Sequence, residues 1–327
     1  MNAIVISKTG GPEVLEYTEG PHLQPGPGQL LVKVAAVGVN FIEIYQRTGI
    51  YQKPLPFTPG AEFAGTVEAV GEGVTGFSVG DHVASVDSIS GSYAQRALVA
   101  ATRAVRVPPE IPLETAAAAM LQGLTAHYLT TSTWPVKAGD TALVHAAAGG
   151  MGLLLTQMIK ARGGRVIGTV STKEKEDLAR SVGADEIIRY TEVDDLAGAV
   201  RDLTENRRGV DVVYDGVGKT TFDASLASLR PRGLLALYGA ASGPVPPFDL
   251  QRLNAAGSLF ITRPTLTHHI AAPEELAWRT GELLGAIAEG KLSITIGSRY
   301  PLAEAAAAHT ALASRATTGK VLLIPEQ

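Results

Sequence analysis

A glycine-rich turn after a short apolar strand is the segment of this 327-residue chain best suited to hold a ligand. Residues 141–145 read as a strand, residues 146–152 as the turn, and an apolar helix pattern follows. Ala147, Gly149 and Gly152 stand where a dinucleotide-binding turn needs small residues, with alanine at the first position. A helix beginning there presents unpaired N–H groups to a pyrophosphate. The pattern predicts a dinucleotide site; a purely structural glycine turn is the alternative.

The end of the next strand bears on which dinucleotide binds. An NAD site places an acidic residue there to hold the ribose hydroxyls. Here the strand ends at Val170, and Ser171, Lys173 and Lys175 follow with hydroxyl and ammonium groups suited to a 2′-phosphate. The same residues are also compatible with an ordinary helix start whose lysines lie in solvent. The sequence therefore favours NADPH over NADH.

Strand and helix patterns alternate around these two loops, which is typical of βαβ units and a parallel sheet. The predicted strands cover residues 141–145, 165–170, 186–189, 210–214 and 233–238. The predicted helices cover residues 150–162, 173–181, 194–203 and 222–229. This part of an α/β chain is thus expected to be doubly wound.

The two ends of the chain have a different pattern. The first hundred residues are β-rich, with strands predicted at 30–37, 64–70 and 77–86, the last interrupted by a turn at Gly80 and Asp81, and they suggest a compact barrel-like domain. A helix is predicted from residue 112 to 120. The tail offers helices at 273–289 and 302–314 and strands at 294–296 and 321–324. Because a single terminal strand needs a sheet to join, we expect the tail to return to the first domain.

Composition excludes several classes of function. The formal net charge is −4, so no global positive field favours nucleic acid or an anionic membrane. The chain has no cysteine, which excludes disulfides, a catalytic thiol and Cys-built zinc sites, and its seven histidines show no metal-ligand spacing. The N-terminus lacks the pattern of a signal peptide. We expect a cytoplasmic protein with no metal, no nucleic-acid partner and no membrane partner.

Several further segments, in their order and spacing, carry a family resemblance. They are residues 10–15, 38–43, 59–65, 123–126, 145–150, 214–218, 261–264 and 314–317. Along essentially its whole length the chain resembles quinone oxidoreductases of the zeta-crystallin type, within the zinc-free medium-chain dehydrogenase/reductase superfamily.

The resemblance implies a fold and a domain division. A GroES-like β-barrel catalytic domain is expected from residues 1–122 and 265–327. A doubly wound Rossmann domain that binds NADPH is expected from residues 123–264. The resemblance also implies a homodimer built by edge strands of the two nucleotide domains.

The resemblance assigns the site residues as well. It implies that Asn40, Tyr45 and Tyr51 are catalytic and face the nicotinamide and the substrate. It implies a cofactor-binding set of Asn40, Thr125, Ala148, Gly149, Gly150, Met151, Gly152, Ser171, Lys175, Tyr190, Gly216, Ser242, Arg263 and Arg315. A tyrosine of a β domain can equally be a half-buried core residue, and Asn40 can simply hold a turn.

The function that the resemblance implies is NADPH-dependent reduction of quinones without a metal. The segment 59–62 lacks the ligand histidine of the zinc-dependent relatives, so the acceptor must take electrons without a Lewis acid, as a quinone does. Two alternatives stay open. One is an NADPH-dependent enone or alkenal double-bond reductase on the same scaffold. The other is an NADPH-binding structural or RNA-binding protein.

Overall fold

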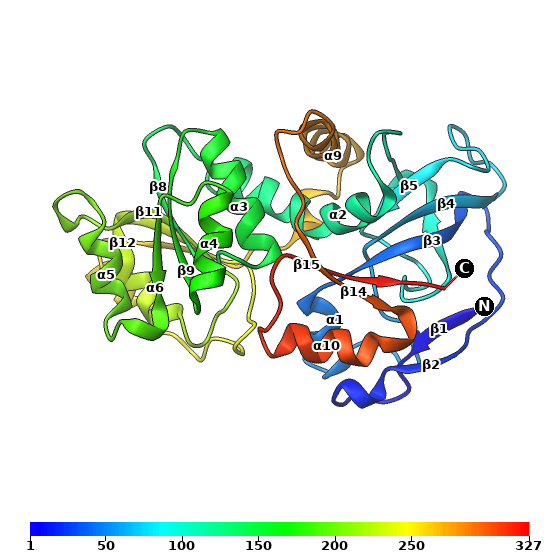
Figure 1. The fold of residues 1–327 in the computed structure, drawn as a ribbon, viewed down its shortest axis with the longest axis horizontal. Helices are drawn as coiled ribbons and strands as arrows, with labels where there is room; N and C mark the ends of the chain where they lie inside the picture. The colour runs from blue at the N-terminus through cyan, green and yellow to red at the C-terminus, as the bar shows by residue number, and fades with distance from the viewer. Residues whose placement is uncertain (327) are drawn as a thin grey trace. The chain divides into compact units, whose positions relative to one another are not determined.

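The computed structural model describes residues 1–326 and divides into two compact units (Figure 1). One unit joins Met1–Leu124 to Ala272–Gln327, and the other is Thr125–Ala271. The sequence prediction placed these two breaks after residues 122 and 264. Among the described residues, no helix is long and apolar enough to cross a membrane.

A six-stranded parallel sheet organises the unit Thr125–Ala271, in the order β10-β9-β8-β11-β12-β13. The chain starts in the middle of the sheet, runs outward to one edge, returns to the centre and runs to the other edge. This is the predicted doubly wound fold. Its strands are β8 (Thr141–Val144), β9 (Arg165–Val170), β10 (Glu186–Arg189), β11 (Val210–Asp215), β12 (Leu229–Leu237) and β13 (Phe260–Thr262).

Two helices of this unit begin at a residue whose side chain caps them. Thr172 caps one of them by accepting from the Lys175 N–H, and Asp195 caps the next by accepting from the Gly198 N–H. The four helices of the βα units are α3 (Gly150–Ala161), α4 (Lys173–Ser181), α5 (Leu196–Asp202) and α6 (Phe222–Ser228). Two short helices, α7 (Gln251–Ala255) and α8 (Leu266–His269), lie in its last part.

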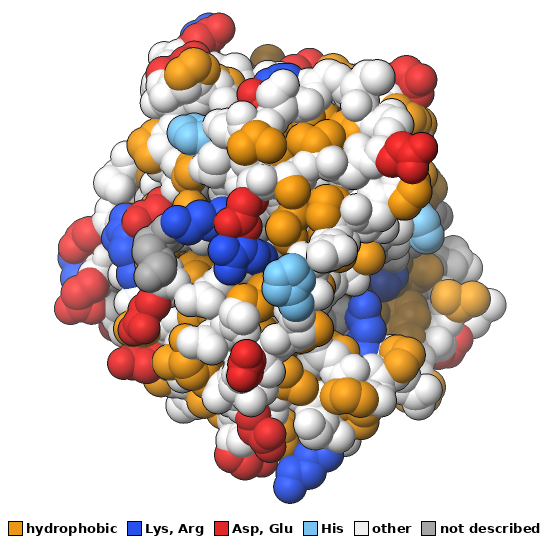
Figure 2. Space-filling model, turned by 90° about the vertical axis from the view of Figure 1, so that its right-hand side faces the viewer, with side chains coloured by type: hydrophobic (Ala, Val, Ile, Leu, Met, Phe, Trp, Pro, Cys, Tyr) orange, Lys and Arg blue, Asp and Glu red, His pale blue; other side chains and the backbone are white. Residues whose placement is uncertain are grey.

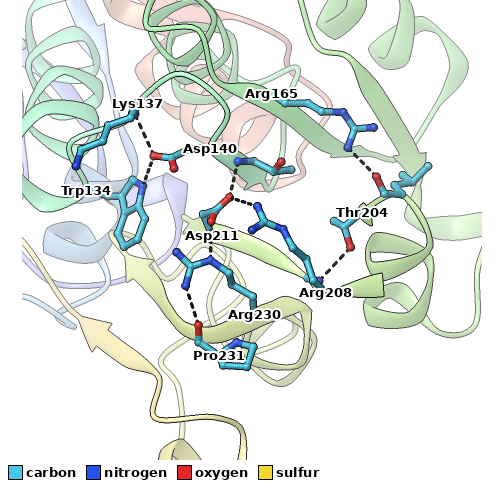
Figure 3. Close-up of polar contacts among 12 residues, drawn as sticks. Trp134, Lys137, Asp140, Arg165, Thr204, Arg208, Asp211, Arg230 and Pro231 are labelled. Carbon is cyan, nitrogen blue, oxygen red and sulfur yellow. Dashed lines mark hydrogen bonds and ion pairs between the residues drawn. The ribbon is translucent and has the colours of Figure 1, made fainter. Parts of the chain in front are cut away.

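The amino ends of the central strands are joined by one buried carboxylate (Figure 3). Asp211, near the start of β11, accepts from the Thr141 N–H at 2.7 Å, from Arg208 at 3.0 Å and from Arg230 at 2.6 Å. These contacts hold β8, β11 and β12 in register at the edge opposite to their carboxyl ends. The loops at the carboxyl ends therefore leave from a fixed platform.

The other unit is built on a seven-stranded sheet in the order β14-β15-β3-β4-β5-β7, with β6 also paired to β3. The terminal strand β15 pairs antiparallel with β3, so the predicted return of the tail is confirmed (Figure 1, red beside blue). The strands are β3 (Gln29–Val39), β4 (Phe63–Val70), β5 (His82–Ser85), β6 (Arg96–Ala100), β7 (Val105–Arg106), β14 (Ile296–Pro301) and β15 (Lys320–Ile324). A separate hairpin pairs β1 (Asn2–Val5) with β2 (Glu16–Glu19).

The helices of this unit and two strand bounds differ from the sequence prediction. The helices are α1 (Phe41–Arg47), α2 (Leu113–Tyr128), which contains the break between the units, α9 (Pro273–Ala288) and α10 (Ala305–Ala313). Within the segment 77–86 only β5 is a strand, because residues 78–81 form a turn, at the place where one was predicted, in which the Ser78 N–H donates to Asp81. The strand predicted at 294–296 starts only at Ile296 and runs to Pro301.

Candidate active site

The turn after β8 has the geometry of an anion site. Gly149 is the N-cap of α3 and offers no side chain, so no capping side chain occupies the first N–H groups of the helix. A Cβ on Gly152 would lie 2.4 Å from the Ala146 carbonyl oxygen and 2.5 Å from the Ala147 Cα. Only glycine permits this approach of helix to strand, as the fingerprint requires. The predicted residues Ala148, Gly150 and Met151 belong to the same turn and first helical turn.

The loop after β9 places hydroxyl and ammonium groups beside this turn. Ser171 directly follows the strand, and Lys175 lies in the first turn of α4. The Lys173 ammonium is 2.5 Å from the Asp177 carboxylate, which makes it the weaker candidate for a phosphate. Thr191 donates to the Ser171 carbonyl at 3.2 Å and so brings the end of β10, with the neighbouring Tyr190, to the same place.

The loops after β11 and β12 are bonded to each other. The Ser242 N–H and hydroxyl both donate to the Val217 carbonyl, each at 2.8 Å, and the Ser242 hydroxyl accepts from the Thr220 N–H. A Cβ on Gly216 would lie 2.8 Å from the Tyr238 ring, so the backbone is tightly packed here. Two residues predicted from distant segments, Gly216 and Ser242, thus lie on adjacent loops.

Parallel strands explain why these residues gather. Every strand of the sheet runs in the same direction, so the residues that follow the six strands lie at one edge. The residues predicted there are Gly149, Gly150, Met151, Gly152, Ser171, Lys175, Tyr190, Gly216, Ser242 and Arg263. Arg263 directly follows β13, and its side chain is exposed. Thr125 is buried in α2 of the same unit. Asn40 and Arg315 belong to the other unit.

A buried hydrogen-bond chain beneath these loops was not predicted. His145 contacts the Thr169 hydroxyl through Nδ1 at 3.0 Å and the Ser225 hydroxyl through Nε2 at 2.9 Å. Ser225 donates to the Asp215 carboxylate at 2.8 Å. Ser225 therefore accepts from the Nε2–H of His145, and Nδ1 accepts from Thr169. Burial lowers the pKa of His145, so the imidazole is neutral in this chain.

The other end of this chain shapes the loop of Gly216. The second oxygen of Asp215 accepts from the Val217 N–H at 2.8 Å and from the Gly218 N–H at 2.9 Å. Four side chains thus connect the ends of β8, β9 and β11. The sequence held only an indirect signal for this network, namely polar residues at the ends of otherwise apolar strands.

The predicted catalytic residues lie around α1, a helix that sequence analysis missed. Asn40 is its N-cap, and the Asn40 N–H donates to the Glu43 carboxyl group at 2.8 Å in a capping box. Tyr45 lies on the helix, and its ring is 5.3 Å from that of Tyr51, edge to face. The Tyr51 N–H donates to the Tyr45 carbonyl, and the Tyr51 side chain is 43% exposed. The Asn-x-x-Glu spacing was the available signal for this helix.

The Asn40 side chain is held by a buried ion pair. The Lys320 ammonium donates to Asn40 Oδ1 at 2.7 Å and to Glu62 Oε2 at 2.5 Å. Asn40 Nδ2 donates to the same Glu62 oxygen at 2.9 Å. Glu62 Oε1 accepts from the Leu121 N–H at 2.5 Å. Sequence reasoning found Asn40 but neither of its charged partners.

Glu43 lies beside this pair and is uncharged at neutral pH. Burial raises the pKa of the Glu43 carboxyl to about 8, and the negative charge of Glu62 adds to the effect. The Lys320 ammonium and the Asn40 N–H oppose it without cancelling it. The first turn of α1 therefore rests on a neutral carboxylic acid.

Two family models match the chain, one for each kind of unit. The alcohol dehydrogenase GroES-like domain matches residues 26–109. The zinc-binding dehydrogenase domain matches residues 150–274. These matches agree with the barrel sheet of one unit and the parallel sheet of the other.

Full-length relatives define the family more closely. A quinone oxidoreductase of Pseudomonas aeruginosa is 48% identical over 97% of this chain and 97% of its own length. The chain belongs to the quinone oxidoreductase family. A 2-haloacrylate reductase of a Burkholderia species is 43% identical over 99% of both chains. The solved structure of Escherichia coli quinone oxidoreductase complexed with NADPH is 41% identical, with a TM-score of 0.96 over 99% of this chain and 100% of its own.

One of the family models carries zinc in its name, but the residues present here do not fit that ion. Ala61 precedes Glu62, and both Glu62 oxygens are already bonded to groups of this chain. The charge beside Glu62 is the Lys320 ammonium, which would repel a cation. Within residues 1–326, no group of three or more His, Cys, Asp or Glu side chains could hold a metal.

The raised pKa of Glu43 predicts a pH dependence of stability. Its carboxyl ionises near 4.5 when unfolded and at about 8 when folded, so between these values only the unfolded state has lost the proton. Wild-type stability therefore falls as pH rises through this window. The Glu43→Gln side chain cannot ionise, so the variant does not have this loss. As pH rises, its free energy of unfolding minus that of the wild type should increase by up to about 1.4 kcal/mol for each pH unit.

Urea unfolding at pH 5, 6, 7 and 8 measures this difference. Glu72→Gln, at an exposed carboxylate of the same unit, is the matched control and should follow the wild type at every pH. Parallel curves for Glu43→Gln and the wild type would show that Glu43 is already ionised in the folded protein.

Proposed function

We propose that this chain is an NADPH-dependent quinone reductase that works without a metal. The observation that carries the proposal is the carboxyl edge of the parallel sheet. There an uncapped helix N-terminus, a strand ending in Val170 instead of a carboxylate, and Lys175 fit a dinucleotide that bears a 2′-phosphate. Relatives named quinone oxidoreductase, one of them solved with NADPH, support the cofactor and the acceptor.

We assign the cofactor contacts as follows. The first turn of α3 takes the pyrophosphate, because its N–H groups and its dipole favour an anion. Ser171 and Lys175 take the 2′-phosphate, and Tyr190 lies beside the adenosine. The set of cofactor residues is completed by Asn40, Thr125, Gly216, Ser242, Arg263 and Arg315. When bound, NADPH supplies a hydride, which carries two electrons.

We assign the acceptor to Asn40, Tyr45 and Tyr51. A tyrosine hydroxyl can donate a hydrogen bond to a quinone oxygen and stabilise the negative charge that develops there. Conversion of the quinone to the hydroquinone takes the hydride and one proton from solvent, so no metal and no further reductant is needed. Phe41 and Tyr45, whose rings are 6.2 Å apart, offer an apolar surface for a flat acceptor.

A second acceptor class has support of its own. The relative named 2-haloacrylate reductase is 43% identical to this chain over 99% of both lengths, and the quinone oxidoreductase of Pseudomonas aeruginosa is 48% identical over 97%. An enone or another activated alkene is therefore the alternative acceptor. A purely structural or RNA-binding role has less support, because acidic, basic and apolar side chains are interspersed on the face shown in Figure 2 and the net charge is −4.

A panel of acceptors tests the proposal. Steady-state NADPH oxidation should be fastest with para- and ortho-quinones, slower with enones, and unchanged after dialysis against a strong chelator. Higher kcat/KM for enones would favour the alternative. Stoichiometric zinc in the purified protein, with activity that follows the zinc content, would contradict the metal-free reaction.

Lys175 should set the preference for NADPH. A charge-assisted contact to phosphate contributes about 1.5–3 kcal/mol, so Lys175→Ala should weaken NADPH binding roughly 10- to 150-fold and leave NADH binding nearly unchanged. Lys173→Ala is the matched control and should change neither, because Lys173 pairs with Asp177. Dissociation constants at two salt concentrations measure the effect. Equal losses for both cofactors would assign Lys175 to the fold.

We further infer a homodimer formed through β13. This strand is an edge of the six-stranded sheet, and the Phe260 side chain on it is 57% exposed. An edge strand offers unpaired N–H and C=O groups to a second copy, and the ring adds apolar area. A cytoplasmic location is the remaining part of the proposal, and cell fractionation tests it.

Sedimentation measures the oligomeric state. The wild type should sediment at twice the chain mass of 34.1 kDa, and Phe260→Asp should move toward the monomer. Val79→Glu adds a charge at an exposed apolar residue of the other unit and should remain dimeric. A dimer that survives Phe260→Asp with unchanged affinity would place the interface elsewhere.

A further inference from the structure

The barrel unit buries a complete ion pair that no step of the proposed reaction uses. Lys320 on β15 is 1% exposed and Glu62, just before β4, is fully buried. They meet at Asn40, which is 5% exposed at the start of α1. Three segments that are far apart in the sequence thus converge on one amide.

Stability alone does not account for this pair. Removing an ammonium and a carboxylate from water costs several kcal/mol for each ion, and their attraction often no more than offsets that cost. Replacing a buried ion pair with apolar side chains of similar volume is often neutral or stabilising. What an ion pair adds is direction, because its hydrogen bonds fix the groups between its two charges.

The group fixed here is the Asn40 amide. Its oxygen accepts from Lys320 at 2.7 Å and from Gln122 at 3.4 Å. Its nitrogen donates to Glu62 at 2.9 Å and to the Gly38 carbonyl at 3.4 Å. Because the ammonium can only donate and the carboxylate can only accept, the amide has one permitted orientation.

Asn40 passes this constraint to α1. Its backbone N–H is bonded to the Glu43 carboxyl inside the helix, and Tyr45 follows less than one turn later. A seven-residue helix has little stability of its own, so its first turn depends on such contacts. The ion pair, the Asn40 amide and the capping box therefore form one continuous set of hydrogen bonds that fixes the first turn of α1, the helix that carries Tyr45.

We propose that Lys320 is a positioning residue of the acceptor site, acting through Asn40 and the first turn of α1 on Tyr45. The inference rests on the proposed function, since it assigns Lys320 to the reaction at that site. The positive charge here orients protein groups and touches no acceptor atom.

The charged and titratable groups around Lys320 come from several elements. Glu62 and Glu43 interact with it directly. Tyr93 is also near both carboxyls, and its hydroxyl bonds to His309 of α10 at 2.9 Å, next to Arg47 of α1. Burial lowers the pKa of His309 to about 3, so this side chain adds no charge at neutral pH.

Four variants separate positioning from stability. Lys320→Met removes the ammonium and leaves Glu62 unpaired. Lys320→Arg keeps the charge. Lys320→Met combined with Glu62→Gln removes both charges but presents an amide N–H₂ to Asn40 Nδ2, so the orientation of Asn40 is lost. Arg279→Met is the matched control: Arg279 is also fully buried in this unit and pairs with Glu275, far from α1 in the sequence.

Three quantities are measured for each variant: kcat/KM, the dissociation constant of NADPH and the midpoint of thermal unfolding. The acceptor is 1,4-naphthoquinone or an enone, whichever the wild type reduces faster. Lys320→Met should lose about 10- to 100-fold in kcat/KM, the cost of a misplaced group, and the NADPH dissociation constant should change by less than this loss. Lys320→Arg should recover most of the loss. The double variant should regain thermal stability but not kcat/KM, and Arg279→Met should lose stability only.

Two results would overturn the proposal. One is wild-type kcat/KM in Lys320→Met. The other is recovery of kcat/KM together with stability in the double variant, which would make the pair a structural element only. Failure of the proposed function has a different signature, because the wild type would then reduce no quinone while the variants could still be compared on the enone.

Discussion

The loops that carry the proposed cofactor residues are held by one chain of buried hydrogen bonds, from Thr169 through His145 and Ser225 to Asp215. Buried polar groups without partners are costly, so each member of this chain fixes the next. Because the members come from the ends of β8, β9 and β11 and from α6, the loops after three strands cannot shift independently. The site for a dinucleotide at the carboxyl edge of the sheet depends on this constraint.

In the barrel unit, a buried ion pair fixes the start of the short helix α1. This helix carries Tyr45, and the Asn40 amide at its start can turn over unless its partners distinguish its oxygen from its nitrogen. The Lys320–Glu62 pair removes that freedom, and because Glu43 is uncharged, the capping box lies in the core without adding an unpaired anion. Both units thus use buried polar groups to fix loops and short helices whose own stability is small.

The alternation of strands and helices could be predicted closely, because the parallel strands are buried runs and two of the helices between them, α4 and α5, begin at a side-chain cap. Residues 165–170, 173–181 and 186–189 were predicted with the bounds that the structure has. The helix α1 was missed because seven residues show no helical period, although Asn40 and Glu43 gave a capping signal. The buried clusters could not be predicted, because Lys320 and Asn40 lie 280 residues apart and only the pairing of β15 with β3 brings them together. Family resemblance supplied Tyr45, Tyr51 and Arg315, and no pattern in the sequence alone would have singled them out.

The central claim is that a bound NADPH passes its hydride to a quinone in this protein. Single-turnover stopped flow tests it most directly, with the NADPH complex formed in advance, mixed with increasing quinone and followed at the nicotinamide absorbance. The account predicts loss of that absorbance at a rate that saturates with quinone and falls when NADPH carries deuterium at the transferred position. A rate that stays at the level of the same NADPH and quinone mixed without protein, with no isotope effect, would contradict it.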